Sequence, residues 1–423
     1  MLVLALTAPT LVQAQGLGNS PYSALGIGEP YPLANVANLG MGGLGISNAS
    51  PFYLNSQNPA LLARRSRFTV FEVGLLGQSK TLTQNLSGLN GQESQRDFGA
   101  NLSYLALAFP ASSRWNMALS LRPFSYVDYT TRQYGRVPGT IYEVEYNYSG
   151  RGAINRASFA NGVRLGKNMY VGVDASFLFG SVTNNASSQV LIDATDDVRV
   201  DRINQVNYSD IIWKLGGAWR PKLSDKWTLN LGATYDPRTR IRARETDIFQ
   251  QLSVASGQAI SPADTLRFAG AGRVTMPQQT NVGISLEKNN QLTVGVDVGF
   301  TNWNQFRTVS EQPANLARSL HLATGLEYTP KPNSTNYWNL VSYRAGFQYN
   351  RTPYVIEGRQ PTDISVSAGL SLPVGAYFVN HVNLAVVAGQ RGAVVGPEIR
   401  ERYVRFALGL SLNDWWFRKT VVD

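Results

Sequence analysis

The chain has 423 residues, with 38 Lys and Arg against 28 Asp and Glu, which gives a formal net charge of +10. Only 16% of the residues are charged, yet no apolar run approaches the roughly 18 residues that a membrane-spanning helix requires. The absence of Cys excludes disulfides, thiolate metal sites and lipidated cysteine. Together with 39 Gly, 20 Tyr and 8 Trp, this composition is typical of a transmembrane β-barrel.

The excess of positive charge bears on whether the protein binds nucleic acid or membrane lipid. Lys and Arg are scattered along the chain and form no phosphate-reading motif, so we expect no nucleic-acid partner. Anionic membrane lipid and lipopolysaccharide are the counter-charges that we expect for an exported protein of this composition.

The first fourteen residues resemble the end of a secretory signal. Residues 2–6 and 11–12 are apolar, and Ala14 supplies a small residue for cleavage before Gln15. A charged start is missing, so we expect residues 1–14 to be a signal peptide, either whole or truncated at its start. A buried N-terminal strand is the alternative.

Residues 15–65 are rich in Gly, Asn, Pro and Ala, nearly uncharged, and without period-two alternation. Gly40, Gly42 and Gly45 spell GxGxxG, but a dinucleotide site needs a strand before that motif and a helix after it, and neither is expected here. The glycines instead indicate close-packed backbone. Asn58 before Pro59 predicts a turn that opens a short helix. We therefore predict a compact hatch inside the barrel, whose key positions are Gly40, Gly42, Gly43, Asn58, Pro59 and Ala60.

From residue 67 onward the chain alternates between apolar and polar residues with period two, which is typical of strands whose two faces contact different surroundings. The stretch 291–303 is the cleanest, and the stretch 400–413 is followed directly by Trp415, Trp416 and Phe417, as at a lipid interface. The pattern predicts fourteen strands, at about 67–79, 97–110, 115–131, 141–165, 169–181, 206–220, 226–245, 267–287, 291–303, 316–330, 338–350, 362–373, 381–391 and 400–413.

The connections between these strands alternate in length. Short turns are expected at 111–114, 166–168, 222–225 and 288–290, and long polar loops at 80–96, 182–205, 246–266 and 304–315. This arrangement is typical of bacterial outer-membrane barrels, and an even strand count places both ends of the chain on the periplasmic side. We therefore predict an all-β, antiparallel transmembrane barrel over residues 66–419, followed by a tail at 420–423. A soluble sandwich is the alternative, and a division of strand 141–165 at Gly150-Arg151-Gly152 would change the strand count.

Charged residues share the polar face of several predicted strands. Because unpaired buried charge is costly, we expect these side chains to pair across the lumen. Either a plain pore lining or contact with a ligand would explain them. The predicted lumen charges are Arg122, Asp174, Lys214, Asp297, Glu327, Arg344 and Arg405.

Four arginines, Arg238, Arg240, Arg242 and Arg244, lie an even number of residues from Thr234 in the predicted strand 226–245, which places them on the same face of that strand. On that basis they continue the lumen face past the extracellular rim, where guanidinium groups could capture carboxylates or phosphates. The alternatives are pairing with Glu143 and Glu145, or contact with lipopolysaccharide.

Little in the sequence indicates an enzyme. The chain has only two histidines, His321 and His381, and neither has the Ser and Asp partners of a hydrolase, although an outer-membrane phospholipase stays an alternative. Asp193, Asp196, Asp197 and Asp201 lack the Gly and terminal Glu of a calcium loop. We expect no catalytic residue, metal or cofactor.

The order of parts, a hatch of about fifty residues before fourteen strands, resembles the FadL-type long-chain fatty-acid and toluene outer-membrane transporters. Asn58-Pro59-Ala60 is similar to the NPA signature of that family. Further segments look like the version common in Bacteroidetes, in which many members have no proven substrate and some barrels are accessory subunits. These segments are Asn19-Ser20-Pro21-Tyr22-Ser23, Gly40-Met41-Gly42-Gly43, Ser411-Leu412-Asn413-Asp414 and Trp416-Phe417.

The resemblance implies a hatch that blocks the lumen and a kinked third strand with a lateral opening for apolar ligands. Pro123 and Phe124 lie in the predicted third strand, and proline marks a break or bulge there, although an ordinary rim bulge would also explain it. The function we predict is passive uptake of fatty acids or similar hydrophobic small molecules. The alternative is a non-transporting barrel that serves as a subunit or plug partner of an outer-membrane secretion or assembly complex.

Overall fold

The computed structural model describes residues 16–48, 50, 52–64, 68–85, 92–191, 198–260, 264–288, 291–375, 379–394 and 398–414. The predicted signal peptide at 1–14 lies outside these residues, as do Trp415, Trp416 and Phe417. Asp193, Asp196 and Asp197 also lie outside them.

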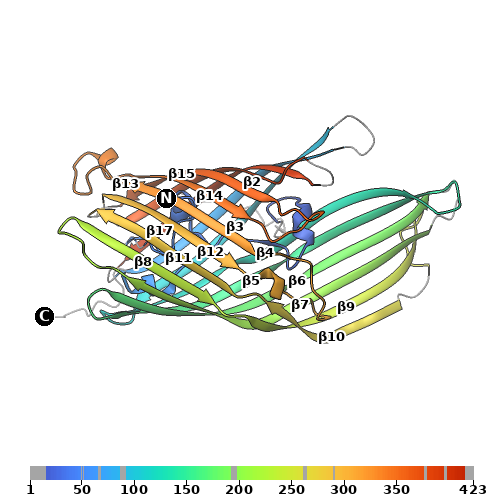
Figure 1. Ribbon diagram of the computed structural model, residues 1–423, viewed down its shortest axis with the longest axis horizontal. Coiled ribbons are helices and arrows are strands. Elements are labelled where there is room, and N and C mark those ends of the chain that lie inside the picture. The colour runs from blue at the N-terminus through green and yellow to red at the C-terminus, as the bar shows by residue number, and fades with distance from the viewer. Residues whose placement is uncertain are drawn as a thin grey trace, which may run out of the picture.

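The described strands form a closed antiparallel barrel (Figure 1). Strands that follow one another in the chain pair with each other, apart from β8 with β9 and β10 with β11, and β17 returns to pair with β2, so that Thr69 lies opposite Asp414. The strands are β2 (Thr69–Asn85), β3 (Gln92–Pro110), β4 (Trp115–Arg136), β5 (Glu143–Leu165), β6 (Met169–Leu191), β7 (Val198–Trp219), β8 (Trp227–Asp236), β9 (Thr239–Ser253), β10 (Asp264–Met276), β11 (Gln279–Lys288), β12 (Leu292–Thr301), β13 (Ser319–Tyr328), β14 (Ser342–Arg351), β15 (Thr362–Val374), β16 (Asn380–Arg391) and β17 (Arg400–Asp414).

Two of the fourteen barrel strands are interrupted. β8 and β9 follow one another across Pro237, and both pair with β7. β10 and β11 follow one another across Pro277, and they pair with β9 and β8 respectively. The predicted count of fourteen strands is therefore confirmed, and β5 is a single strand with no division at its Gly-Arg-Gly stretch.

The outer wall of the barrel is apolar and the inner wall is polar. On β12, Val294, Val296 and Phe300 are exposed on the outside, whereas Thr293 and Asp297 are buried inside. Because hydrocarbon offers no hydrogen-bond partners, a sheet with such an outer face has to close on itself, and the β2–β17 ladder closes it. None of the helices in the described part of the chain is long and apolar enough to cross a membrane.

The two rims of the barrel differ. The ends of β2 and β17 meet at one rim, which we call the short-turn rim because tight connections such as 111–114 and 166–168 lie there. Residues 329–341 are a longer connection at the same rim and contain the 3-10 helix η4 (Tyr337–Asn339). The opposite rim carries the longer connections, and we call it the long-loop rim.

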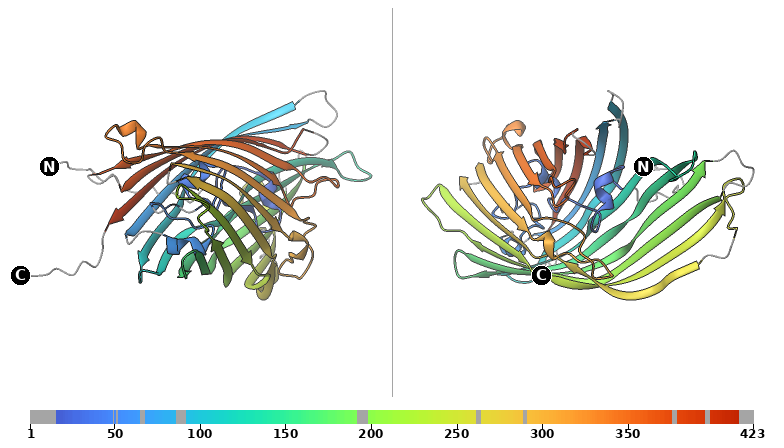
Figure 2. Two further views of the ribbon diagram at one scale, coloured as in Figure 1. Left: turned by 60° about the vertical axis from the view of Figure 1, so that its left-hand side comes forward. Right: turned by 45° about the vertical axis from the view of Figure 1, so that its right-hand side comes forward.

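Beyond the long-loop rim, six strands continue as a curved sheet (Figures 1 and 2). We call it the extended sheet; it comprises the described residues between 130 and 149, between 183 and 206, and between 245 and 270, which belong to β4, β5, β6, β7, β9 and β10 and to the connections that join them. The prediction of loops at 182–205 and 246–266 was therefore wrong for most of these residues. Backbone ladders hold these strands together, although their side chains lack the apolar alternation of the barrel wall.

The described N-terminal residues between 16 and 64 pack against the inner wall. They include η1 (Pro21–Ala24), β1 (Glu29–Pro30), α1 (Val36–Leu39) and η2 (Pro59–Arg64). One hydrophobic cluster joins Val36, Leu54 and Leu62 to wall residues such as Tyr104 and Ala385. A second cluster, towards the long-loop rim, joins residues of η1 to the connections between β12 and β13 and between β14 and β15. Its members include Tyr22, Ile27, Phe306, Val309, Leu316 and Tyr354.

Candidate functional site

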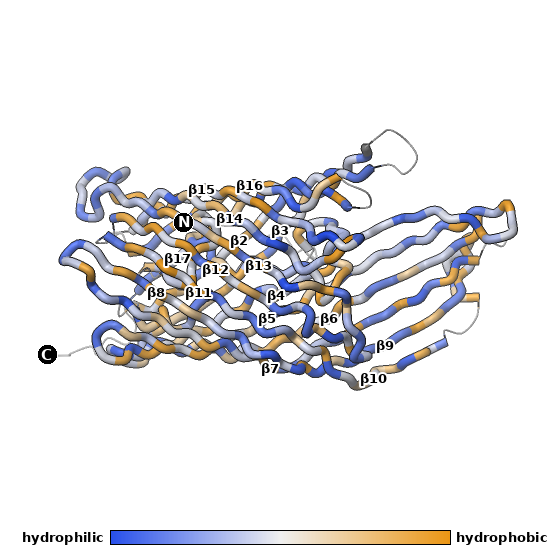
Figure 3. The backbone as a smooth tube through the Cα atoms, viewed as in Figure 1, coloured by the Kyte–Doolittle hydropathy of each residue, from blue (hydrophilic) through white to orange (hydrophobic). Residues whose placement is uncertain are grey.

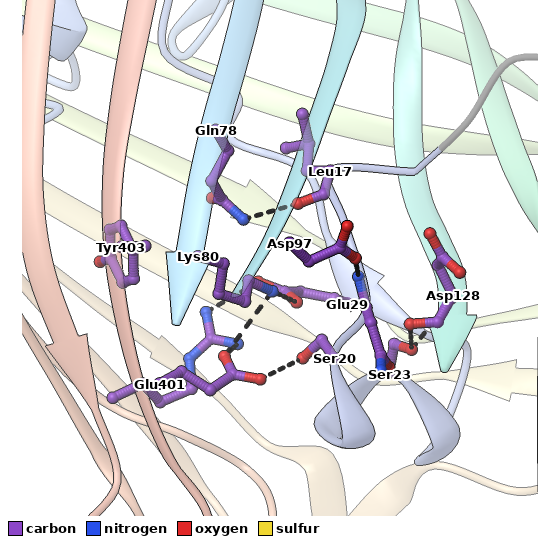
Figure 4. A network of polar contacts seen from close by, with 12 residues as sticks. Leu17, Ser20, Ser23, Glu29, Gln78, Lys80, Asp97, Asp128, Glu401 and Tyr403 are labelled. Atoms are coloured by element: carbon purple, nitrogen blue, oxygen red, sulfur yellow. Dashed lines mark hydrogen bonds and ion pairs between the residues drawn. The ribbon is translucent and has the colours of Figure 1, made fainter. Parts of the chain in front are cut away.

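A group of buried charges joins the N-terminal segment to the barrel wall (Figure 4). Arg391 of β16 lies 2.8 Å from Glu29, 3.3 Å from Asp363 and 3.4 Å from Glu401. Lys80 of β2 adds contacts of 3.6 Å to Glu29 and 3.8 Å to Glu401.

Arg405 completes the group at 4.0 Å from Glu29. We call these six residues the clamp: Glu29, Lys80, Asp363, Arg391, Glu401 and Arg405. Three carboxylates face three cations, so the group is electrically balanced although nearly dry. Ser20 also donates a hydrogen bond of 2.6 Å to Glu401, which ties η1 to the same group.

The predicted lumen charges all face inward, and most of them hold the N-terminal segment. Asp297 accepts hydrogen bonds of 2.7 Å from the backbone amides of Gly45 and Ile46. Arg122 donates to the carbonyl oxygen of Leu33 at 2.6 Å and to the Ser56 hydroxyl at 2.7 Å.

Other lumen charges pair with each other or with the wall. Arg344 donates to Glu327 at 2.7 Å, and Glu327 also accepts a hydrogen bond from Tyr53 of the segment. Asp174 pairs with Arg156 at 3.0 Å. Lys214 lies 3.6 Å from Asp236, and Arg405 donates to Gln78 at 2.6 Å.

Two of the three glycines predicted for the hatch lie where backbone meets backbone. An added Cβ on Gly40 would lie 2.9 Å from the Cα of Gly369, and one on Gly42 would lie 2.8 Å from the backbone of Phe347. Gly42 also donates to the Ser367 hydroxyl at 2.8 Å and has φ +68°. Gly43 has φ +84°, which favours glycine, but open space surrounds it.

Asn58-Pro59-Ala60 begins the 3-10 helix η2, as the predicted turn and short helix required. The Asn58 amide donates to the carbonyl oxygens of Ile46 at 2.8 Å and of Gly217 on the wall at 3.2 Å. Its own oxygen accepts from the backbone amide of Ala60 at 3.1 Å. Asn58 thus caps η2 and joins two parts of the segment to β7.

Pro123 lies at a bulge, as predicted. The register of β4 against β5 shifts between Pro123 and Ser125, which leaves Phe124 unpaired. On its other side β4 pairs with β3 only up to Leu121, opposite Leu105. Above that pair the two neighbouring strands share no ladder, and we call this interval the β3–β4 seam.

The N-terminal segment occupies the seam. Glu29 and Pro30 pair with Tyr126 and Ser125 of β4, and the amide of Tyr31 donates to the Phe124 carbonyl at 2.9 Å. On the β3 side, the amide of Asn19 donates to Asp97 at 2.6 Å. The segment therefore supplies β4 with backbone partners that β3 does not provide.

A groove of about 660 Å³ lies on the outer surface below the seam. It is lined almost entirely by apolar side chains of β2 to β7, including Leu105, Leu121, Phe159, Phe177 and Ile211. These residues are exposed on the outer wall, so the groove opens outward rather than into the lumen.

The predicted direction of the arginine row was wrong. All four arginines, Arg238, Arg240, Arg242 and Arg244, are exposed, whereas the alternating Ile241 and Ala243 are buried in the interior cluster. The break at Pro237 between β8 and β9 shifts the parity by one residue, and a shift of one residue exchanges the two faces of a strand. The alternative, pairing with Glu143 and Glu145, is likewise absent among the described residues; Arg242 instead pairs with Asp210 at 3.3 Å.

The extended sheet carries many large apolar side chains in contact with solvent, among them Ile141 at 87% and Phe268 at 81% exposure. Figure 3 shows hydrophobic segments at its far ends as well as along the barrel wall. The set is Tyr134, Ile141, Tyr142, Tyr146, Tyr148, Val190, Leu191, Val198, Phe249, Val254, Ile260, Leu266 and Phe268.

Sequence reasoning missed five members of the clamp. Glu401 lies four residues before Arg405 in the last strand and therefore on the same face, so alternation could have predicted its inward direction. Lys80 was assigned to a loop, and Glu29, Asp363 and Arg391 had no pattern that connected them. His321 contacts Asn350 and His381 contacts the Val379 carbonyl. Among the described residues, no three His, Asp or Glu side chains gather as metal ligands would.

The closed barrel has the fold of FadL-family outer-membrane channels. It is similar to the Pseudomonas putida toluene transporter TodX, with 15% identity over 92% of this chain and 100% of that one and a TM-score of 0.57. The Ralstonia pickettii toluene transporter TbuX gives 16% identity, coverages of 90% and 98%, and a TM-score of 0.53. A Pseudomonas aeruginosa FadL homologue has 13% identity over 92% of this chain and 99% of that one, with a TM-score of 0.56.

A family model described as BamG matches residues 1–423. The chain therefore belongs to the BamG family. None of the curated proteins matches it.

Proposed function

We propose that this protein is a barrel-anchored subunit of an outer-membrane secretion or assembly complex, and that its extended sheet binds another subunit. The exposed apolar surface of the extended sheet is the observation that carries the proposal. Monomeric proteins rarely expose so many large apolar side chains together outside a membrane, and such surfaces mark protein–protein contacts.

The interior of the barrel also favours a structural role. Hatch residues are held by Asp297, Arg122 and Glu327, and the clamp holds the segment near the long-loop rim. Breaking one such buried pair leaves an uncompensated charge, which costs about 3–5 kcal/mol. A hatch with this many attachments is costly to displace, and a lumen that stays closed would suit a subunit better than a channel.

The free edge of the extended sheet indicates how the partner is bound. Among the described residues, those of β10 between 264 and 270 have a strand neighbour only in β9. The register shifts there and Ala269 has φ +45°, so the edge is bulged. Because bulges disfavour edge-to-edge pairing, we expect the partner to contact side chains on the sheet face rather than to add a strand.

The test removes the hairpin tip of β4 and β5. Tyr129 and Gly150 are register partners, so an Asn-Gly turn can replace residues 130–149 without changing the barrel ladder. We expect the shortened protein to fold and insert, but to lose its partners after cross-linking in intact cells and quantitative mass spectrometry. A variant with Tyr134→Ser, Ile141→Ser and Tyr142→Ser should lose the same partners.

The matched control carries Arg132→Ser, Gln133→Ser and Arg136→Ser on the same hairpin, and it should keep the partners. Retention of every partner by the shortened protein would contradict the proposal. Equal loss in the control would show that hairpin shape, rather than its apolar side chains, makes the contact.

A second candidate is passive uptake of fatty acids or similar hydrophobic small molecules through a lateral route. The apolar groove below the seam favours it, since a ligand that leaves sideways needs an apolar surface to enter the membrane. In this candidate the N-terminal segment has to leave the seam during each passage.

A disulfide tests that route. Pro30 and Ser125 are opposite one another in an antiparallel pair, which places their Cα atoms within reach of a disulfide, and the chain has no other Cys. The oxidised Pro30→Cys, Ser125→Cys variant should lose uptake of an apolar probe into liposomes, and reduction should restore it. Equal uptake in both states would exclude the seam as the route.

A further inference from the structure

The outward-facing arginines form a patch where the barrel wall meets the extended sheet. Arg242 of β9 lies directly opposite Arg273 of β10, and the exposed Arg240 and Arg244 follow on the same face of β9. We call these four residues the arginine patch. The intervening Ile241 is buried in the interior, which fixes the outward direction of its neighbours.

Most of the patch has no carboxylate partner among the described residues. Only Arg242 has a carboxylate partner, Asp210 at 3.3 Å; Arg240, Arg244 and Arg273 form no ion pair among the described residues. Two arginines directly opposite each other on neighbouring strands repel. An arrangement that places four guanidinium groups together with one carboxylate therefore favours an external anion.

The patch lies next to the apolar outer wall. Tyr235 is exposed on the outside of β8, and Arg240 follows it by five residues, about 16 Å along the strand. The β7–β9 ladder ends with Tyr208 opposite Ala243. If the same register is continued for three more residues, Ile211 of β7 lies level with Arg240. Ile211 lines the outer groove. An aromatic and aliphatic wall followed by arginines is the order of residues expected at a membrane surface.

We propose that the arginine patch binds the phosphate groups of phosphorylated glycolipid in the outward leaflet of the membrane. A guanidinium group donates two parallel hydrogen bonds to phosphate oxygens, and opposite arginines on adjacent strands suit a headgroup with more than one phosphate. The acyl chains of the same lipid would lie along the wall below, beside Ile211 and the outer groove. The site fixes the height of the barrel in the membrane and hence of the extended sheet above it.

The experiment is a titration of the purified full-length protein in detergent, followed by native mass spectrometry. The probes are a bis-phosphorylated glycolipid and the same glycolipid after removal of its phosphates. If each arginine strengthens binding by roughly fivefold, Arg240→Gln, Arg242→Gln and Arg273→Gln together should weaken binding of the phosphorylated probe about 100-fold. The dephosphorylated probe should bind all variants equally weakly.

The matched control, Arg132→Gln, Arg136→Gln and Arg199→Gln, removes the same charge from the extended sheet and should leave binding unchanged. Equal binding of the phosphorylated probe by the patch variant and the unmodified protein would overturn the proposal. So would displacement of the lipid by an equal concentration of inorganic phosphate, which would assign the patch to the free ion. Retained heat-modifiability on gels shows that each variant is folded.

Discussion

The clamp and the extended sheet use the same kinds of ion pair in opposite surroundings. In the clamp, Arg391 and Glu29 are almost fully buried, whereas in the extended sheet Arg202 pairs with Asp247 at 2.7 Å with most of its own side chain in water. Water screens the second pair and weakens it, whereas loss of one member of the first leaves a bare charge in a dry interior. The comparison teaches that the loss of one charge costs far more in the clamp than in the extended sheet, and this difference supports the proposed division between a closed interior and a sheet that a partner contacts.

The largest expected effect comes from the clamp. Arg391→Met removes the cation shared by Glu29, Asp363 and Glu401, and we expect a loss of about 3–5 kcal/mol in the free energy of unfolding. Urea titration of the folded protein in detergent measures it. Arg202→Met is the control and should cost less than about 1 kcal/mol because most of the Arg202 side chain lies in water, which screens the pair. Similar losses in both variants would remove the distinction between the two regions.

A second test concerns the contact between the hatch and the wall. Gly42→Ala places a Cβ 2.8 Å from the Phe347 backbone at φ +68°, so we expect a cost of roughly 2 kcal/mol or more. Gly43→Ala has a similar φ but open space around it, and it should cost only about 1 kcal/mol. Thermal unfolding of the two variants separates packing from backbone strain. Equal melting temperatures would show that the hatch does not press on β14.

The smallest effect on stability is expected in the extended sheet. Phe268→Ser removes an almost fully exposed side chain and should change the free energy of unfolding by less than about 0.5 kcal/mol. The same substitution should reduce the amount of cross-linked partner recovered from cells. A large loss of stability together with unchanged partner recovery would mean that Phe268 packs within the protein rather than against a partner.

Much of the barrel could be predicted because its signals are local. Alternation such as Thr293, Val294 and Gly295 is visible in any short window, and it gave the number of strands and the inward direction of Asp297 and Lys214. Pro123 marked a bulge because proline cannot donate to a ladder. The Asn58-Pro59 turn was likewise predictable from the two residues alone.

Two predictions failed, the direction of the arginine row and the loops at 182–205 and 246–266, and in both cases the local alternation was misleading. The direction of Arg242 depends on a parity count through Pro237, and one irregular residue reverses it. The strands of the extended sheet were assigned to loops because polar side chains on both faces conceal the alternation, although the backbone ladder forms regardless. Arg199 and Arg202, on opposite faces of β7, illustrate this.

By itself the sequence determined the closed barrel, its strand number and the polar character of its interior, since these follow from a repeat of two residues and from the requirement that backbone groups in hydrocarbon be paired. Only the tertiary structure decided that Glu29 meets Arg391 and Glu401, that the N-terminal segment occupies the β3–β4 seam, and that the arginine patch faces outward. These contacts join residues hundreds of positions apart or depend on a single break, and no local pattern records either.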